Sequence, residues 1–83
     1  MEYIVYILQS EQDSSFYIGF TSNLEQRLVA HNSGKSRYTS RKIPWKLVYT
    51  ETFKTRSEAM NREKFLKKQR NRDFYRKLIG MEN

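Results

Sequence analysis

A continuous run of aromatic and aliphatic side chains near the N-terminus, Tyr-Ile-Val-Tyr-Ile-Leu at residues 3–8, predicts a buried strand. The polar residues that follow include Asp13-Ser14-Ser15, which favour a turn. Residues 16–21 have the composition of a second strand, and a hairpin is the simplest connection between the two. Gly19 interrupts this second strand. Such a glycine usually marks a bulge, or a place where another group approaches the backbone closely.

Two sequence matches to a capping box predict where helices begin. Ser22 with Glu25 predicts a helix that ends near residues 32–34, and Thr55 with Glu58 predicts one that runs to about Gln69. Two further elements are predicted from the pattern and composition of their residues. Residues 45–53 alternate in polarity and predict a third strand, and residues 71–79 predict a short last helix closed by Gly80.

The segment between the first helix and the third strand, residues 34–44, is cationic and rich in small residues, so we expect a loop with at most a short helical piece. The expected order is therefore β-β-α-loop-β-α-α. This order predicts an α+β fold, with a three-stranded, mainly antiparallel sheet flanked by helices. A chain of 83 residues makes one domain, 1–83, and a domain of this size buries about 60% of the surface that its unfolded chain exposes.

The net charge of +7 and the isoelectric point near 9.9 bear on partners rather than on fold. A positive excess of this size favours polyanions, with nucleic acid first and an anionic membrane surface second. The alternative is a cationic surface that serves solubility alone.

The chain has no cysteine, which excludes disulfides, thiolate zinc sites and a cysteine nucleophile. Its single histidine excludes a metal site built on a histidine pair. No signal peptide is evident, and no apolar run approaches the length that crosses a bilayer. We expect a cytoplasmic protein that does not engage membranes.

One acidic side chain falls on an apolar helix face. In a regular helix after Thr55, Glu63 lies in the arc that Ala59 and Leu66 share. Burying a carboxylate is costly unless a cation holds it. That cation is either a metal ion or a basic side chain such as Arg62 or Arg70, and the sequence leaves both readings open.

Four other side chains are candidates for phosphate chemistry. Arg27 and His31 are one helical turn apart on the same face of the first predicted helix. Guanidinium suits phosphate, and imidazole can relay a proton near neutral pH. The alternative is a solvated helix face. Tyr6 and Tyr17 lie on adjacent predicted strands, where a tyrosine is more often a core residue, although a hairpin can bring both hydroxyls to one face.

Two basic segments have the composition of a nucleic-acid contact, in which cations and hydroxyls bind phosphate without reading sequence. The alternative for the first is a flexible, solvated connection. The candidate contacts are Lys35, Arg37, Tyr38, Thr39, Arg41 and Lys42 in the first segment, and Lys64, Lys67, Lys68 and Arg70 in the second.

Taken together, Val5-Tyr6, Tyr17-Ile18-Gly19, Arg27, His31 and Glu63 resemble the active-site signature of the GIY-YIG nuclease family. The resemblance spans nearly the whole chain and is strongest to small single-domain members, which are similar to the N-terminal nuclease domain of the excision-repair excinuclease. There are departures from the family pattern. Ile4 stands at the glycine of the first triplet, Phe20 stands where the repair enzyme has lysine, and Asn71 is a candidate for the family's asparagine.

The resemblance implies hydrolysis of phosphodiester bonds in nucleic acid, with DNA favoured over RNA and with repair or branched DNA as contexts. It implies catalytic roles for Tyr6, Tyr17, Arg27, His31 and Glu63, and one Mg²⁺ or Mn²⁺ ion on Glu63. The alternatives are a nucleic-acid-binding module that keeps the fold without cutting, and a basic adaptor for an acidic protein. We expect a monomer or weak dimer, and the sequence identifies no targeting partner.

Overall fold

The computed structural model describes residues 1–35 and 37–80; residue 36 of the expected loop and positions 81–83 of the predicted domain lie outside the described residues. Its three strands form one antiparallel sheet in the order β2-β1-β3, and helices cover both faces. The predicted fold class and element order are confirmed. The elements are β1 (Tyr3–Ser10), β2 (Phe16–Thr21), α1 (Leu24–Asn32), a 3₁₀ helix η1 (Thr39–Lys42), β3 (Trp45–Phe53), α2 (Arg56–Gln69) and α3 (Arg72–Leu78).

The central strand β1 is buried from Val5 to Ser10 and pairs with a strand on each side, which explains why its sequence is a continuous apolar run. It extends two residues beyond the predicted Leu8, because Gln9 and Ser10 still pair with β3. Side chains of a strand alternate between the two faces of a sheet. Val5 and Ile7 therefore point to one face and Tyr6 and Leu8 to the other.

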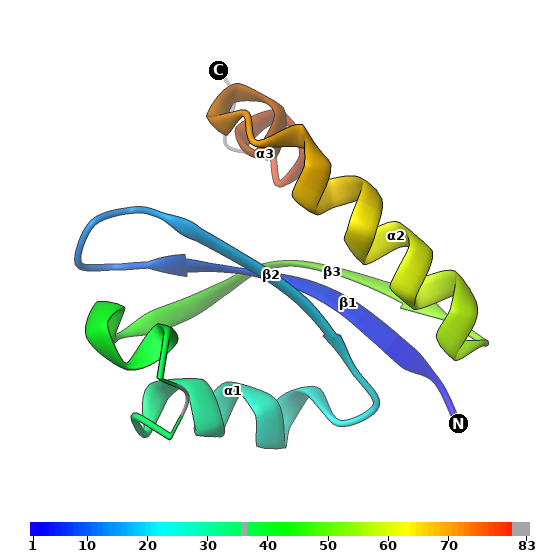
Figure 1. Cartoon of the computed structure of the whole chain (residues 1–83), viewed down its shortest axis with the longest axis horizontal. Helices are drawn as coiled ribbons and strands as arrows, with labels where there is room; N and C mark the ends of the chain where they lie inside the picture. The colour runs from blue at the N-terminus through cyan, green and yellow to red at the C-terminus, as the bar shows by residue number, and fades with distance from the viewer. Residues whose placement is uncertain (36, 81–83) are drawn as a thin grey trace.

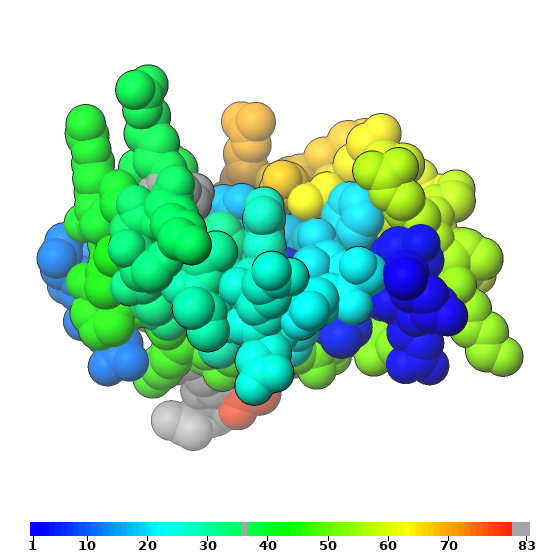
Figure 2. Space-filling view, turned by 90° about the horizontal axis from the view of Figure 1, so that it is seen from below, coloured from blue at the N-terminus to red at the C-terminus, as the bar shows by residue number. Residues whose placement is uncertain are grey.

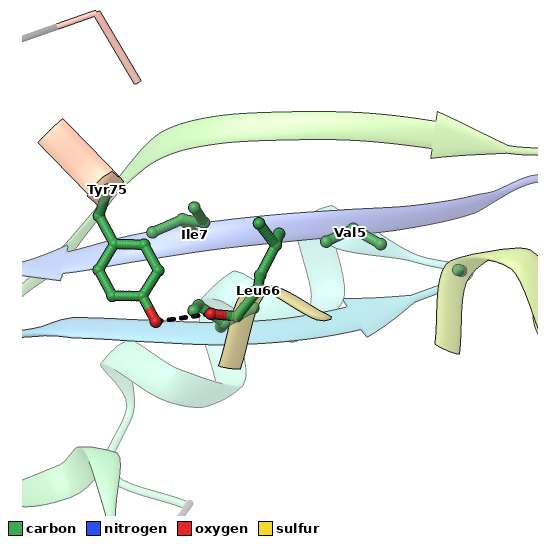
Figure 3. Packing of buried hydrophobic residues seen from close by; sticks show 6 residues of the cluster. Val5, Ile7, Leu66 and Tyr75 are labelled. Atoms are coloured by element: carbon green, nitrogen blue, oxygen red, sulfur yellow. Dashed lines mark hydrogen bonds between the residues drawn. The ribbon is translucent and has the colours of Figure 1, made fainter. Parts of the chain in front are cut away.

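Helices α2 and α3 cover the face that carries Val5 and Ile7 (Figure 1). Leu66 and Tyr75 pack against this face, and the Tyr75 hydroxyl donates a hydrogen bond of 2.7 Å to the Leu66 carbonyl (Figure 3). Ala59 of α2 is fully buried in the same cluster. This cluster is the larger of the two cores, and it fixes α2 against the sheet.

Helix α1 lies on the opposite face of the sheet (Figure 1). The second core is small and is made of Tyr6, Leu8 and Trp45, with Tyr17 and residues of α1 packed around it. The two tyrosines of the sequence pattern are thus part of this layer. Packing holds their rings, so their hydroxyls have defined positions.

The two capping predictions had different outcomes. Thr55 and Glu58 form both bonds of the predicted capping box at the start of α2. The prediction that Ser22 caps α1 is wrong, because Asn23 is the N-cap and its side-chain oxygen accepts from the Gln26 amide at 3.1 Å. Thr21 Oγ1 accepts from the Asn23 amide at 3.1 Å, and this turn places Asn23 at the cap.

The expected loop contains η1, which is tied to the rest of the fold at several points. Ser10 Oγ donates to the Lys42 carbonyl (2.7 Å), and Trp45 Nε1 donates to the Thr39 carbonyl (2.8 Å). Asn32 holds the start of β3, because its side chain accepts from the Trp45 amide (2.6 Å) and donates to the Trp45 carbonyl (3.0 Å). The basic segment is therefore anchored to the small core. None of the helices in the described ranges has the length and apolar character that crossing a membrane requires.

Candidate active site

Tyr6 lies across Gly19, its partner in the β1–β2 register. A Cβ atom added at Gly19 would be 2.6 Å from the Tyr6 hydroxyl oxygen and 2.8 Å from Cζ, both closer than real contacts allow. Of the two readings of Gly19, close approach of another group is therefore the one that the structure shows. The absence of a side chain at this position creates the space that the phenol occupies.

The Tyr6 hydroxyl continues into a buried chain of hydrogen bonds. It is joined to His31 Nε2 at 3.0 Å, and His31 Nδ1 is joined to Thr39 Oγ1 at 3.0 Å. All three residues are buried, with exposures of 1% for Tyr6, 1% for His31 and 0% for Thr39. These hydrogen bonds link three separate elements, β1, α1 and η1. The imidazole is therefore held at both of its ring nitrogens.

Tyr17 is half-buried beside this chain. Its ring centroid is 4.8 Å from that of His31 in an edge-on arrangement, 6.5 Å from Tyr6 and 6.1 Å from Trp45. On its outer side it meets the ring of Tyr38, also at 6.1 Å. Tyr6 and Tyr17 therefore share one face, and aromatic packing on several sides sets the position of Tyr17.

Arg27 projects from α1 toward both phenols and is otherwise exposed. Burial is the largest effect on the pKa of Tyr6 and raises it. The Arg27 guanidinium lowers this pKa, whereas the charges of Tyr17 and Glu63 raise it, and the net result is a raised pKa. Interaction with Tyr6 raises the pKa of Arg27 itself. Burial, aided by the Arg27 charge, lowers the pKa of His31 below its ordinary 6.5, so the imidazole is held neutral.

Glu63 approaches from α2, on the other face of the sheet, yet its charge acts on Tyr6. Its side chain is only 16% exposed, and its carboxylate forms an ion pair with Lys67 (3.3 Å). Neither of the two named alternatives for its cation is the partner: Arg62 pairs instead with Glu51 at 2.8 Å. Glu63 therefore pairs with a basic side chain, as the second alternative expected, and that side chain is Lys67, which is 53% exposed.

The Glu63 carboxylate is a ligand of the kind that a small, hard divalent cation accepts. Mg²⁺ keeps several waters, so it is often held by one or two carboxylates. Across residues 1–35 and 37–80 there is no cluster of three or more histidine, aspartate or glutamate side chains. A metal ion held by Glu63 would therefore have one carboxylate ligand from the described residues.

A groove along the β2 edge joins the two faces of the sheet. It is lined by Phe16, Tyr17, Ile18, Tyr38, Lys67 and Tyr75. In Figure 2, long side chains of the green segment around η1 and of the orange end of α2 project from the same side of the molecule. The exposed members of the predicted basic set are Lys35, Arg37, Tyr38, Arg41, Lys64, Lys67, Lys68 and Arg70.

Two of the residues predicted to contact nucleic acid are not free surface side chains in the structure. Thr39, expected at the substrate surface, is fully buried and faces His31, because the Trp45 indole fixes its backbone inside the small core. Lys42 is half-buried and pairs with Asp13 (3.2 Å), which raises the pKa of Lys42. Asn71 caps α3 through bonds from Asp73 and Phe74 amides. The sequence predicted a close approach at Gly19 but did not identify Tyr6 as the group that makes it, and it missed Thr39 as a neighbour of His31. Only tertiary packing creates these two contacts.

Comparison with known proteins is consistent with this geometry. Residues 2–77 match the model of the GIY-YIG catalytic domain. The chain belongs to the GIY-YIG family. Domains of this family are generally those of endonucleases that depend on a divalent metal, so this chain has a nuclease-type fold.

Similar proteins in the family are small. The chain is 42% identical over 67 residues to a UPF0213 protein of Streptococcus pneumoniae, covering 80% of this chain and 67% of that one. It is 49% identical over 65 residues to a UPF0213 protein of Clostridium perfringens, covering 77% and 69%. The solution NMR structure of a UPF0213 protein from Bacillus halodurans matches with a TM-score of 0.58 and 35% identity over 99% of this chain and 86% of that one.

Proposed function

We propose that this chain is a metal-dependent endonuclease that hydrolyses phosphodiester bonds of DNA, in repair or in the processing of branched DNA. One observation carries the proposal: Tyr6, Tyr17, Arg27 and His31 converge on one face of the sheet, with the Glu63 carboxylate within electrostatic reach of Tyr6. A module that only binds DNA gains nothing from a carboxylate here, since its charge repels phosphate.

Arg27 is the phosphate clamp in this proposal. Its guanidinium keeps its charge at any working pH and presents a planar fork of donors. It faces both phenols, so a phosphate oxygen bound to it lies next to the groups that handle protons. The charge that grows on the phosphate in the transition state strengthens this contact, which is the condition for catalysis by electrostatic stabilisation.

Tyr6 and His31 together accept the proton of the attacking water. The Tyr6 oxygen accepts a proton from water while its own hydroxyl proton moves to His31 Nε2, 3.0 Å away. The lowered pKa of His31 keeps Nε2 free to accept. Arg27 stabilises the phenolate character that Tyr6 acquires during the transfer. Tyr17, which meets several rings and is not hydrogen-bonded to His31, positions the phosphate.

Glu63 would hold the one Mg²⁺ or Mn²⁺ ion, and an ion bound there would supply charge stabilisation to the phosphate. Glu63 must leave Lys67 to do so, and a pair one helical turn apart whose lysine is exposed to solvent is worth only about 0.3–0.5 kcal/mol. The exposed lysines and arginines on either side of the β2-edge groove bind the phosphate backbone of the substrate, with DNA preferred to RNA.

The Glu63–Lys67 pair also favours a second candidate, a nucleic-acid-binding module that retains the fold. In that case Lys67 neutralises the carboxylate permanently, and the groove holds phosphate without cutting it. The two functions differ in whether Glu63 is needed for a chemical step.

Nicking of supercoiled plasmid in Mg²⁺ or Mn²⁺ decides between them. We expect the wild type to nick, Glu63→Gln to lose nicking, and DNA binding by this variant to be retained or increased because a negative charge is removed. Glu11→Gln is the matched control: it removes the same charge from an exposed turn residue and should nick like the wild type.

The other outcomes are equally informative. Salt-dependent DNA binding without nicking by any of these proteins supports the binding module. Undiminished nicking by Glu63→Gln refutes the role of Glu63. Absence of binding at low salt refutes both nucleic-acid functions and favours a basic adaptor.

A further inference from the structure

Thr39 stands out as a buried hydroxyl that neither the family signature nor the proposed roles use. It lies in η1, which forms the last part of the first basic segment, and its side chain has no exposed surface. Its Oγ1 is 3.0 Å from His31 Nδ1, the ring nitrogen opposite the one that meets Tyr6. A threonine in this place can select which imidazole nitrogen carries the proton.

The surroundings of the Tyr6 hydroxyl show which nitrogen carries the proton. Tyr6 is buried, and a buried hydroxyl proton needs an acceptor. Among the described residues the structure gives this hydroxyl one hydrogen-bond partner, His31 Nε2. Arg27, which also faces the Tyr6 oxygen, has only donors to offer. The Tyr6 proton therefore points to Nε2, and Nε2 of the neutral ring must be unprotonated.

The direction of the second hydrogen bond, between His31 and Thr39, follows from this. A neutral imidazole with a bare Nε2 carries its proton on Nδ1. The Nδ1–H then donates to Thr39 Oγ1, which lies at hydrogen-bond distance. The backbone of Thr39 is held in turn by the Trp45 indole, so the acceptor does not drift away from the ring.

We propose that Thr39 is a positioning residue that fixes His31 in the Nδ1–H tautomer and so keeps Nε2 ready to take the proton of Tyr6. The catalytic purpose of this tautomer rests on the proposed nuclease function. The tautomer itself and its dependence on Thr39 do not rest on that function. Without the Thr39 hydroxyl Nδ1–H has no acceptor, so the Nδ1–H tautomer loses stability relative to the other tautomer, whose Nε2–H donates to the Tyr6 oxygen and blocks the transfer.

Because the chain has one histidine, the test is direct. Selective ¹⁵N labelling of histidine gives the two ring-nitrogen resonances of His31 alone, and their shifts report the tautomer above the pH at which the ring titrates. We expect the Nδ1–H form in the wild type, the same form in Thr39→Ser, and a shift toward Nε2–H in Thr39→Val. Thr52→Val is the matched control, because it makes the same change at an exposed position of β3 and should leave the tautomer unchanged.

Plasmid nicking in Mg²⁺ supplies the second readout. Loss of a group that orients a reacting side chain typically costs about 10–100-fold, and we expect a loss of this size in Thr39→Val with recovery in Thr39→Ser. A wild-type spectrum in the Nε2–H form overturns the proposal whether or not Thr39→Val folds. So does a Thr39→Val spectrum identical to that of the wild type. If the wild type does not nick DNA, the proposed function fails, and the spectra still test the role of Thr39.

Discussion

Glu63 and Lys67 form an ion pair of 3.3 Å between side chains one turn apart on α2, and the lysine also lines the β2-edge groove beside Tyr17. The ammonium thus occupies the place of the cation that the carboxylate would otherwise attract. A divalent ion must displace it. The pair is weak, because Lys67 is more than half exposed and solvent screens it.

Replacing Lys67 by methionine should therefore favour metal binding. We expect Lys67→Met to reach half-maximal nicking at a lower Mg²⁺ concentration, with a change in stability below about 0.5 kcal/mol. Lys68→Met removes the same charge from a neighbouring exposed position and controls for weaker DNA binding. A metal titration of the nicking rate for the three proteins measures the effect. Equal metal requirements in all three would contradict the assignment of the ion to Glu63.

Arg27 should not be replaceable by lysine. An ammonium is a point charge and cannot present the paired donors of guanidinium to phosphate and the Tyr6 oxygen together. We expect Arg27→Lys to lower single-turnover cleavage by about 100-fold or more, the usual cost of losing one transition-state donor, with an unchanged melting temperature. Arg76→Lys, an exposed site on α3, should cleave normally. Full activity of Arg27→Lys would mean that charge alone is needed.

The stability of the fold should depend on pH through His31. Its pKa is lowered in the folded chain by burial first and by the charge of Arg27 second, with Tyr6 and Tyr17 the other titratable neighbours. As pH falls through about 6.5, the His31 imidazole takes up a proton in the unfolded chain but stays neutral in the folded chain, so the free energy of unfolding decreases.

Urea unfolding of the wild type and His31→Gln at pH 7.5 and 5.5 measures this contribution. The wild type should lose more stability than the variant between the two pH values, and the difference isolates His31 from all the titratable groups that the two proteins share. An equal loss in both would show that the folded protein does not lower the pKa of His31.

Gly19→Ala should disrupt the site by sterics alone. The new Cβ would meet the Tyr6 phenol at 2.6 Å, and the backbone at this position has no positive φ that would add strain. We expect a cost of about 1–3 kcal/mol, typical of overpacking, together with a loss of nicking of about 100-fold as the phenol shifts. Tyr6→Ala removes the obstacle, so a double-mutant cycle of urea unfolding should show that Gly19→Ala costs much less in that background. Additive costs would place the strain elsewhere.

Much of the fold could be read from local pattern. The bounds of β2, β3 and α2 follow from alternation, composition and the Thr55 capping box, because these signals act over a few residues. The error at Ser22 has the same local origin: two adjacent residues can both cap a helix, and the turn through Thr21 selects Asn23. Strand order is not a local property, and only packing places β1 between β2 and β3.

The candidate site divides in the same way. The sequence by itself determined which reactive groups are present and how they are spaced. These groups are the side chains of Tyr6, Tyr17, Arg27, His31 and Glu63. Only the tertiary structure decided their neighbours: Lys67 rather than Arg62 on Glu63, and Thr39 on His31 rather than at the surface. The physical reason is range. Helix and strand signals span a turn or a pair of residues, whereas burial, hydrogen bonding and the resulting pKa values depend on groups that meet only when the sheet and its two helical layers pack.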